Sequence, residues 1–436
     1  MKKILLAMTI LFLFPLSLLA TPWTPSKVSV YTLPNGFQLY LLENRELPIL
    51  EAKLFVQTGS AYEEEKTEGL ADVTADLLAM GGTASKTPAE LDQWLDEKAI
   101  QLGGDAGREL TQITVSSLAK EWESLLSILQ EVVTAPRWDK DRFDLIIGRT
   151  KEGLRREEDQ PHVLAGRALR KMVYGEKNPW GRQPTVQSIG RISLKDVERF
   201  YKKYYHPNRM LLAVAGDFSK SKVKKWVEEH FGLLKAHDAA APDWQKIPLD
   251  AKRETKRIKK KVTQAFIEAG HIGLERRSPD EYAFALLQYI LGGEPFISRL
   301  GVDIRSQSGL AYSVYSDWET NPAGGMFSIH VQTRADAEKA VLEKIDSHLE
   351  KMTQEADVTP DELKIAKEAV LNKYIFLFDS PFKVVFQQAT FDLLGYPKNY
   401  LEKYPENIRK VTLAEVQAAA KRYLHPDKLK IVVVSP

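Results

Sequence analysis

The chain has 436 residues, of which 44% are hydrophobic and 28% are charged, and its formal net charge is +2. This composition is typical of globular proteins, and the near-neutral charge gives no indication of a polyanion as the main partner. The sequence contains no cysteine, which excludes a disulfide scaffold, thiol catalysis and a lipid anchor on an N-terminal cysteine. At about 150 residues per domain, the length predicts two or three domains.

Residues 1–20 are predicted to be a secretory signal peptide. Lys2 and Lys3 form a positive start, residues 4–14 form an apolar run, and L-L-A at residues 18–20 offers a cleavage site after Ala20. An uncleaved anchor is the alternative, which the shortness of the apolar run disfavours. We therefore expect an exported protein with a periplasmic location and no membrane span after cleavage.

The first half of the mature chain is predicted to mix strands and helices. Strands at residues 28–33 and 37–42 flank P-N-G at residues 34–36, a strong hairpin signal, and residues 50–56 and 210–215 favour two further strands. Residues 101–115 are interrupted by Gly103 and Gly104 before a strand-like end. Helices are predicted at residues 67–80, 87–99, 121–132, 139–158, 163–173 and 193–204.

The second half repeats the first in outline. Residues 192–216 align without gaps to residues 411–435, so a helix, a His-Pro turn and an apolar strand close each half. Residues 236–251 are rich in Ala, Asp and Pro and predict a linker. We therefore predict homologous domains at residues 21–235 and 252–436, of class α+β, each a mostly antiparallel sheet with helices packed on one face.

Residues 252–261 form a strongly basic run. An anionic surface contact is one interpretation, but the run lacks the interleaved aromatic residues of nucleic-acid grooves. A solvated edge that leads into a strand at residues 262–270 is favoured.

Common catalytic motifs are absent from the sequence. None of the eight histidines lies three or four residues from another, so a helical zinc site built on paired histidines is excluded. His206 and His425 occupy equivalent turns, which indicates a structural role. The sequence has no G-x-S-x-G elbow, P-loop or dinucleotide fingerprint, and the glycine pairs at residues 103–104 and 292–293 are weak as phosphate loops.

A series of short motifs nevertheless resembles one family over nearly the whole mature chain. Their order and spacing are those of the pitrilysin/insulinase family of inverted-zincin peptidases, in the half-length form related to mitochondrial processing peptidase. The motifs are Y-T-L-P-N-G at residues 31–36, G-L-A at 69–71, N-P-W-G-R at 178–182, Y-Y-H-P-N at 204–208, L-G-G at 291–293, S-R-L at 298–300 and G-L-A-Y-S-V at 309–314.

The resemblance places the family's H-x-x-E-H on a changed segment. Its two zinc-binding histidines and its general base correspond to Asp72, Asp76 and Ala75, and Ala75 cannot take a proton from water. Glu152 falls at or next to the family's third ligand, although a surface acid is the favoured interpretation. A set of Asp72, Asp76 and Glu152 would suit Ca²⁺, Mg²⁺ or Mn²⁺ better than zinc, and it would still lack a base.

The second half keeps a different family feature. An arginine and a tyrosine in R-x-x-x-G-L-x-Y act on substrate in the family, and Arg305 and Tyr312 match them in this chain with the spacing intact. Arginine can bind a peptide carbonyl or carboxylate, and a tyrosine hydroxyl can stabilise an oxyanion. A core strand at residues 309–314 with Arg305 in a surface ion pair is the competing interpretation.

The resemblance implies half of a clamshell that closes with a second chain around a peptide-binding chamber. We expect a non-catalytic, substrate-binding subunit of a periplasmic zinc-metallopeptidase heterodimer that acts on peptides or unfolded polypeptides. Zinc would then lie on the catalytic partner and no cofactor on this chain. The long glycine-rich loop of the mitochondrial non-catalytic subunit is missing near residues 292–299, so presequence recognition is not implied. A stand-alone peptide-binding or scaffold protein and a divergent active metalloendopeptidase are the alternatives.

Overall fold

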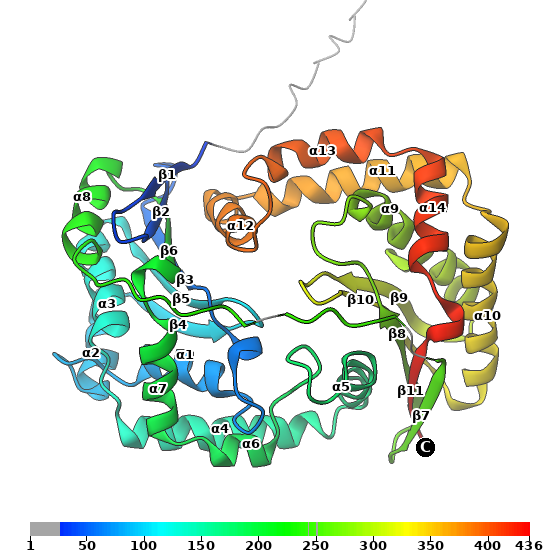
Figure 1. The fold of residues 1–436 in the computed structure, drawn as a ribbon, viewed down its shortest axis with the longest axis horizontal. Coiled ribbons are helices and arrows are strands. Elements are labelled where there is room, and N and C mark those ends of the chain that lie inside the picture. The colour runs from blue at the N-terminus through cyan, green and yellow to red at the C-terminus, as the bar shows by residue number, and fades with distance from the viewer. Residues whose placement is uncertain (1–26, 243, 250–251) are drawn as a thin grey trace, which may run out of the picture.

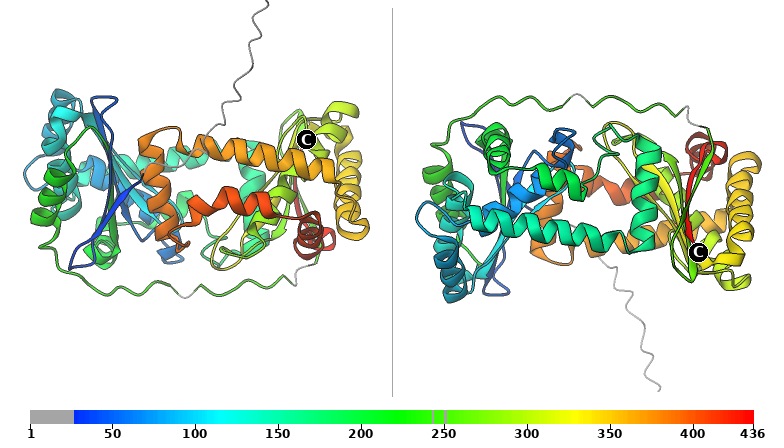
Figure 2. Two further views of the ribbon diagram at one scale, coloured as in Figure 1. Left: turned by 90° about the horizontal axis from the view of Figure 1, so that it is seen from above. Right: turned by 90° about the horizontal axis from the view of Figure 1, so that it is seen from below.

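The computed structural model describes residues 27–242, 244–249 and 252–436, and the predicted signal peptide lies outside the described residues. Within them, no helix has the length and hydropathy that crossing a bilayer requires. The chain forms two β-sheets, each with its own set of helices, and these two units stand side by side (Figures 1 and 2). This arrangement confirms the predicted α+β class with two related units.

The first sheet has six strands in the order β1-β2-β6-β3-β5-β4. Its pairs are antiparallel except for β2 with β6. Strand β4 is an edge of this sheet. The strands are β1 Ser29–Thr32, β2 Gln38–Glu43, β3 Ile49–Val56, β4 Gln101–Ala106, β5 Thr111–Leu118 and β6 Met210–Gly216.

The second sheet has five strands in the order β7-β11-β8-β10-β9. Its one parallel pair joins β7 to β11, so the order matches that of the first sheet without β1, and β9 occupies the place of β4. The strands are β7 Glu254–Lys259, β8 Gln264–Ile272, β9 Ala311–Glu319, β10 Met326–Arg334 and β11 Lys430–Ser435.

Eight α-helices belong to the described part of the first unit and six to that of the second. The first set is α1 Leu70–Met80, α2 Pro88–Lys98, α3 Trp122–Thr134, α4 Lys140–Glu157, α5 Pro161–Tyr174, α6 Val186–Arg191, α7 Leu194–Tyr204 and α8 Lys220–Phe231. The second set is α9 Glu281–Gly292, α10 Glu338–Glu350, α11 Pro360–Ile375, α12 Pro381–Leu393, α13 Tyr400–Lys410 and α14 Leu413–Tyr423.

The internal repeat has a structural counterpart. Helices α7 and α14 begin at equivalent residues, and each starts with a reciprocal capping box, formed by Ser193 with Asp196 and by Thr412 with Glu415. A His-Pro turn then leads into β6 or β11, the strand that pairs in parallel with a neighbour in its sheet. The sequence match therefore marks the same helix–turn–strand unit in both halves.

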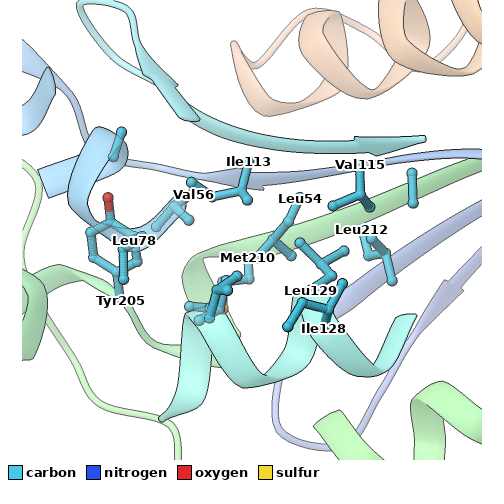
Figure 3. Close-up of a cluster of buried hydrophobic side chains, with 14 of the residues drawn as sticks. Leu54, Val56, Leu78, Ile113, Val115, Ile128, Leu129, Tyr205, Met210 and Leu212 are labelled. Carbon is cyan, nitrogen blue, oxygen red and sulfur yellow. The ribbon is translucent and has the colours of Figure 1, made fainter. Parts of the chain in front are cut away.

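The main core lies between one face of the first sheet and the helices of the same unit. Leu54, Val115 and Leu212 point from the sheet towards Leu129 of α3, as Figure 3 shows, and Leu78 of α1 belongs to the same cluster; all five side chains are fully buried. Burial of apolar surface at this interface contributes about 25 cal/mol per Å². The first face of the sheet therefore fixes the position of α1.

The other face of each sheet is covered by a helix from the opposite unit. Helix α12 packs on β6 and β2 of the first sheet, where Val385 joins Tyr40 and Leu211 in one apolar cluster. Helix α5 packs on β8 and β11 of the second sheet, where Leu169 contacts a cluster that includes Val432. The two units thus exchange helices, which local sequence patterns did not predict.

Two predicted segments differ from the structure. The glycine-interrupted stretch is a regular edge strand, β4, because Gly104 lets it pass directly over α1: a Cβ on Gly104 would lie 2.2 Å from the carbonyl oxygen of Ala75. The basic run at residues 252–261 contains strand β7 rather than only leading into one, and its side chains are mostly exposed at the sheet edge. Basic side chains on an edge strand also disfavour aggregation.

The predicted linker residues contain no helix or strand in their described part. The segment is nevertheless attached to both units. Trp244 packs against Tyr62 and Trp180 of the first unit, and the N–H of Ile247 donates a 2.8 Å hydrogen bond to the carbonyl of Ala323 in the second.

Candidate functional site

Helix α1 carries the residues that resemble the zinc motif, and a buried carboxylate holds its N-terminus. Glu63 accepts hydrogen bonds from the N–H groups of Gly69 at 3.0 Å and Ala71 at 2.7 Å. Gly69 has φ 99°, a left-handed conformation that favours glycine. Burial raises the pKa of Glu63 to about 8 although both hydrogen bonds oppose the rise. The carboxylate satisfies amide groups that the first turn of a helix leaves without partners.

Asp72 and Asp76 lie on one face of α1, as their spacing predicts. The N–H of Ala106 in β4 donates a 3.2 Å hydrogen bond to Oδ1 of Asp72. Burial, and then the charges of Asp105 and Asp76, raise the pKa of Asp72 to about 6. Burial and Asp105 also raise the pKa of Asp76, whereas the cation of Arg149 on α4 opposes that rise. The site is thus a group of partly desolvated acids with an arginine beside it.

Strand β4 covers Ala75, the residue at the position of the family's general base. Ala75 is fully buried, and strand β4 runs over it at the close approach of Gly104. A methyl group has no lone pair with which to accept a proton from water. The geometry therefore supplies no base at this turn of α1.

Glu152 does not join the two aspartates. Its side chain is about half exposed and forms ion pairs with Arg155 at 3.6 Å and Arg156 at 3.3 Å, both on its own helix. One turn earlier on α4, Arg149 is the residue that acts on Asp76. Over residues 27–242, 244–249 and 252–436, no group of three or more His, Asp or Glu side chains is placed to hold a metal ion.

Arg305 lies in a π-helical segment, Gly301–Gln307, that precedes β9. Its guanidinium carbon is 4.2 Å from the centroid of the Phe296 ring, within the range of a cation–π interaction. The guanidinium makes no hydrogen bond or ion pair with any residue that the structure describes. The expected alternative, a surface ion pair, is therefore not formed within the described part of the chain.

Tyr312 lies on β9, the edge strand of the second sheet, and is 71% exposed. Ala311 pairs with Thr333 and Ser313 with Gln332, so Tyr312 is the extra residue of a β-bulge. A bulge bends the strand and changes the direction of the side chain. Its hydroxyl has no partner among the described residues. Arg305 and Tyr312 thus present two polar groups that the fold itself does not use.

One nucleophile–imidazole–carboxylate chain occurs elsewhere, on the second sheet. Ser328 Oγ lies 3.0 Å from Nε2 of His330, whose Nδ1 lies 2.5 Å from Oε2 of Glu268. The ring of Tyr315 stacks on His330 at 4.6 Å. Ser328 is only 4% exposed and lies within β10. These bonds therefore connect β8, β9 and β10 and do not present a nucleophile to a substrate.

Comparison with known proteins agrees with this geometry. The family model described as "Insulinase (Peptidase family M16)" matches residues 40–178, and "Peptidase M16 inactive domain" matches residues 191–370. The chain belongs to peptidase family M16. The resemblance inferred from the short motifs is thereby confirmed.

M16 relatives that match this chain over nearly their whole length carry different names. "Uncharacterized zinc protease YmxG" of Bacillus subtilis is 26% identical over 93% of this chain and 98% of its own. "Non-peptidase homolog YmxG" of Helicobacter pylori is 24% identical over 100% of this chain and 99% of its own. Some relatives of this length are therefore named as proteases, and others are named as non-peptidase homologues.

Two solved structures share the fold. A peptidase M16 inactive domain from Pseudomonas fluorescens superposes with a TM-score of 0.84 at 26% identity, over 94% of this chain and 98% of that one. The periplasmic protease PqqL from Escherichia coli superposes with a TM-score of 0.78 at 16% identity, over 100% of this chain but 49% of that one. The fold of this chain thus corresponds to about half of the longer PqqL chain.

Sequence reasoning missed several residues of the α1 site. Glu63, Asp105 and Arg149 all act on its electrostatics. Arg149 lies three residues before Glu152, one helical turn away, so a search by helical face rather than by aligned position would have found it. Asp105 and Glu63 belong to a strand and a loop, and no local signal connects them with α1.

Proposed function

We propose that this M16 chain is the non-catalytic, substrate-binding subunit of a periplasmic zinc-metallopeptidase heterodimer that acts on peptides or unfolded polypeptides. One observation carries the proposal: the polar groups of Arg305 and Tyr312 have no hydrogen-bond or ion-pair partner among the described residues, while the α1 site holds acids, an alanine and an arginine in the place of a zinc centre. Zinc would be bound by the partner.

The chemistry of α1 supports the non-catalytic part of the proposal. A zinc centre of this type needs three protein ligands and a base that activates water. Asp72 and Asp76 are not joined by Glu152, and Arg149 brings a positive charge towards them, which disfavours a cation at this position. Ala75 removes the base. Hydrolysis by this route is therefore not available to the chain alone.

The edge of the second sheet supports the substrate-binding part. Strand β9 ends its sheet, so its outer backbone groups can pair with an extended peptide. The Arg305 guanidinium can donate two parallel hydrogen bonds to a carbonyl or carboxylate, and the Tyr312 hydroxyl can donate to an oxyanion that forms at the partner's zinc. Both side chains flank the start of this strand.

The match to PqqL supports an assembly of two units. That chain is about twice as long as the region that superposes on this one, which leaves room for a second unit of the same size. A half-length chain can reach an equivalent arrangement by pairing with another chain. PqqL is described as periplasmic, and the charged start and apolar run of residues 1–20 support the same location here.

The decisive experiment is co-expression with a chain of this family that carries an intact H-x-x-E-H. We expect the purified pair to cleave unstructured peptides and each chain alone to be weakly active or inactive. Arg305→Ala and Tyr312→Phe should each lower kcat/KM of the pair at least about tenfold, since removal of one oxyanion donor typically costs 10²–10³ in rate. Arg191→Ala and Tyr31→Phe are matched controls on the other unit.

Three results would contradict the proposal. Full activity of the zinc-bearing chain alone would exclude a division of labour. Unchanged activity in both variants would indicate a scaffold. Chelator-sensitive cleavage by this chain alone, lost in Asp76→Ala, would show a divergent active peptidase. Each variant is also tested for co-purification with the zinc-bearing chain. A variant that still co-purifies but has lost activity has lost chemistry, whereas a variant that no longer co-purifies has lost assembly.

A further inference from the structure

A cavity of 440 Å³ lies in the second unit, among α9, α11, α13 and the end of β9. Figure 1 shows these helices grouped at one side of the second sheet. A cavity of this volume is in the range of small-molecule sites. Its walls are dominated by aromatic rings, from Tyr289, Tyr374, Tyr396, Tyr400, Tyr404 and Trp318.

A buried carboxylate contributes to the same wall. Glu281 at the start of α9 is only 7% exposed, and its Oε1 accepts hydrogen bonds from the hydroxyls of Tyr400 at 2.9 Å and Tyr396 at 3.1 Å. No described cation forms an ion pair with it. Two phenol donors stabilise a carboxylate, but they bring no positive charge into the cavity.

The cations close to this wall are engaged elsewhere. Arg276, which acts electrostatically on Glu281, donates from Nη1 to Oε2 of Glu109 at 2.9 Å. Lys373 on the cavity wall forms an ion pair with Glu294, and its Nζ lies 5.3 Å from the centroid of the Tyr289 ring. Glu281 therefore has no ion-pair partner among the described residues, and a positively charged ligand can provide one.

The geometry points to a binding site for a small organic cation, an amine with an aromatic or aliphatic body whose charged group lies beside Glu281. The aromatic walls can bind such a ligand in two ways. They cover its apolar body, and the faces of their rings attract its positively charged amine. The site lies apart from α1, Arg305 and Tyr312, so the inference does not depend on the proposed function.

Isothermal titration of the full chain with three probes of similar shape tests this assignment. The probes are 2-phenylethylamine, 2-phenylethanol and phenylacetate, which differ in charge. We expect the amine to bind at least tenfold more tightly than the alcohol and the acid to bind most weakly. Glu281→Gln should reduce the preference for the amine over the alcohol to about twofold or less, because the side chain keeps its size and loses its charge.

Two further variants keep the test decisive. Ala285→Leu fills the cavity but retains Glu281, and it should abolish binding of both amine and alcohol, so it serves if Glu281→Gln fails to fold. Glu350→Gln, an exposed acid on α10, should leave all three affinities unchanged. Equal binding of amine and alcohol to the wild-type chain, unchanged binding in Ala285→Leu, or no binding of the amine at millimolar concentration would overturn the inference.

Discussion

The α1 site of the first unit and the Arg305–Tyr312 edge of the second differ in how far the fold uses their polar groups. Glu63 and Asp72 accept backbone hydrogen bonds, Asp76 lies near Arg149, and β4 covers the turn between the two aspartates. Arg305 only stacks on Phe296, and Tyr312 projects from a bulge. The difference indicates that the first site has become part of the structure, whereas the second is still available to a ligand.

The two regions lie at corresponding edges of the two related units. Strands β4 and β9 occupy equivalent edges of their sheets. In the first unit the edge strand packs tightly on a helix through Gly104, and in the second the edge carries a bulge and a π-helical approach. Both irregularities are common at functional sites. The same topology thus holds one closed region and one open region.

The largest expected effect tests the closure of the α1 site. Gly104→Ala places a Cβ 2.2 Å from the carbonyl oxygen of Ala75, so the backbone must move and the free energy of unfolding should fall by about 3 kcal/mol. Gly103→Ala, one residue away with no atom within 4 Å of the new Cβ, should change it by about 0.5 kcal/mol or less. Urea denaturation measures both.

Equal stability of the two glycine variants would contradict the conclusion that β4 closes the α1 site. It would mean that β4 does not press on α1 and that the turn between the aspartates is accessible. Activity of the pair provides a second measurement, because Gly104→Ala at a temperature where the chain remains folded should leave kcat/KM nearly unchanged.

A smaller effect concerns the charge of the same site. The folded-state pKa of Asp72, about 6, is raised above its ordinary value of 3.8. The folded state therefore favours the protonated form, and this stabilisation is present below about pH 4 and is lost as the pH rises through 6. Asp72→Asn does not titrate, so between pH 4.5 and 8 it should gain about 2 kcal/mol of stability relative to the wild-type chain.

Thermal and urea unfolding at several pH values measure the relative gain of Asp72→Asn. Asp141→Asn, an exposed acid in the first turn of α4, is the control and should show no such gain. Glu63 titrates in all three proteins, and because the Asp72 charge helps to raise its pKa, Asp72→Asn also lowers the pKa of Glu63 and adds to the pH-dependent difference. A flat difference between wild type and Asp72→Asn would show that Asp72 is well solvated and that its site is open to water.

These predictions also show which features the sequence could reveal. The hairpin at Asn35-Gly36 and the capping box of Thr87 with Glu90 depend on neighbours in the chain, so both were predictable. The exchange of α5 and α12 between the units depends on contacts between distant segments, and no local pattern encodes it. The position of Arg149 towards Asp76 depends on how α4 packs across α1. Alignment to a motif instead selected Glu152, one turn further along α4, whose side chain forms ion pairs with Arg155 and Arg156.

The smallest predicted effect concerns the contact between Phe296 and Arg305 next to strand β9. Phe296 is 67% exposed, and its ring lies under the Arg305 guanidinium. An exposed cation–π contact is worth about 0.5–1 kcal/mol, so Phe296→Ala should raise KM of the pair about two- to fivefold, with kcat little changed. Phe296→Tyr should restore the wild-type value because it keeps the ring. Phe376→Ala, with 68% exposure but no cation on its ring among the described residues, should have no effect. An equal rise in KM for both alanine variants would assign the effect to lost apolar surface, and Arg305 would then not be positioned for substrate by its contact with Phe296.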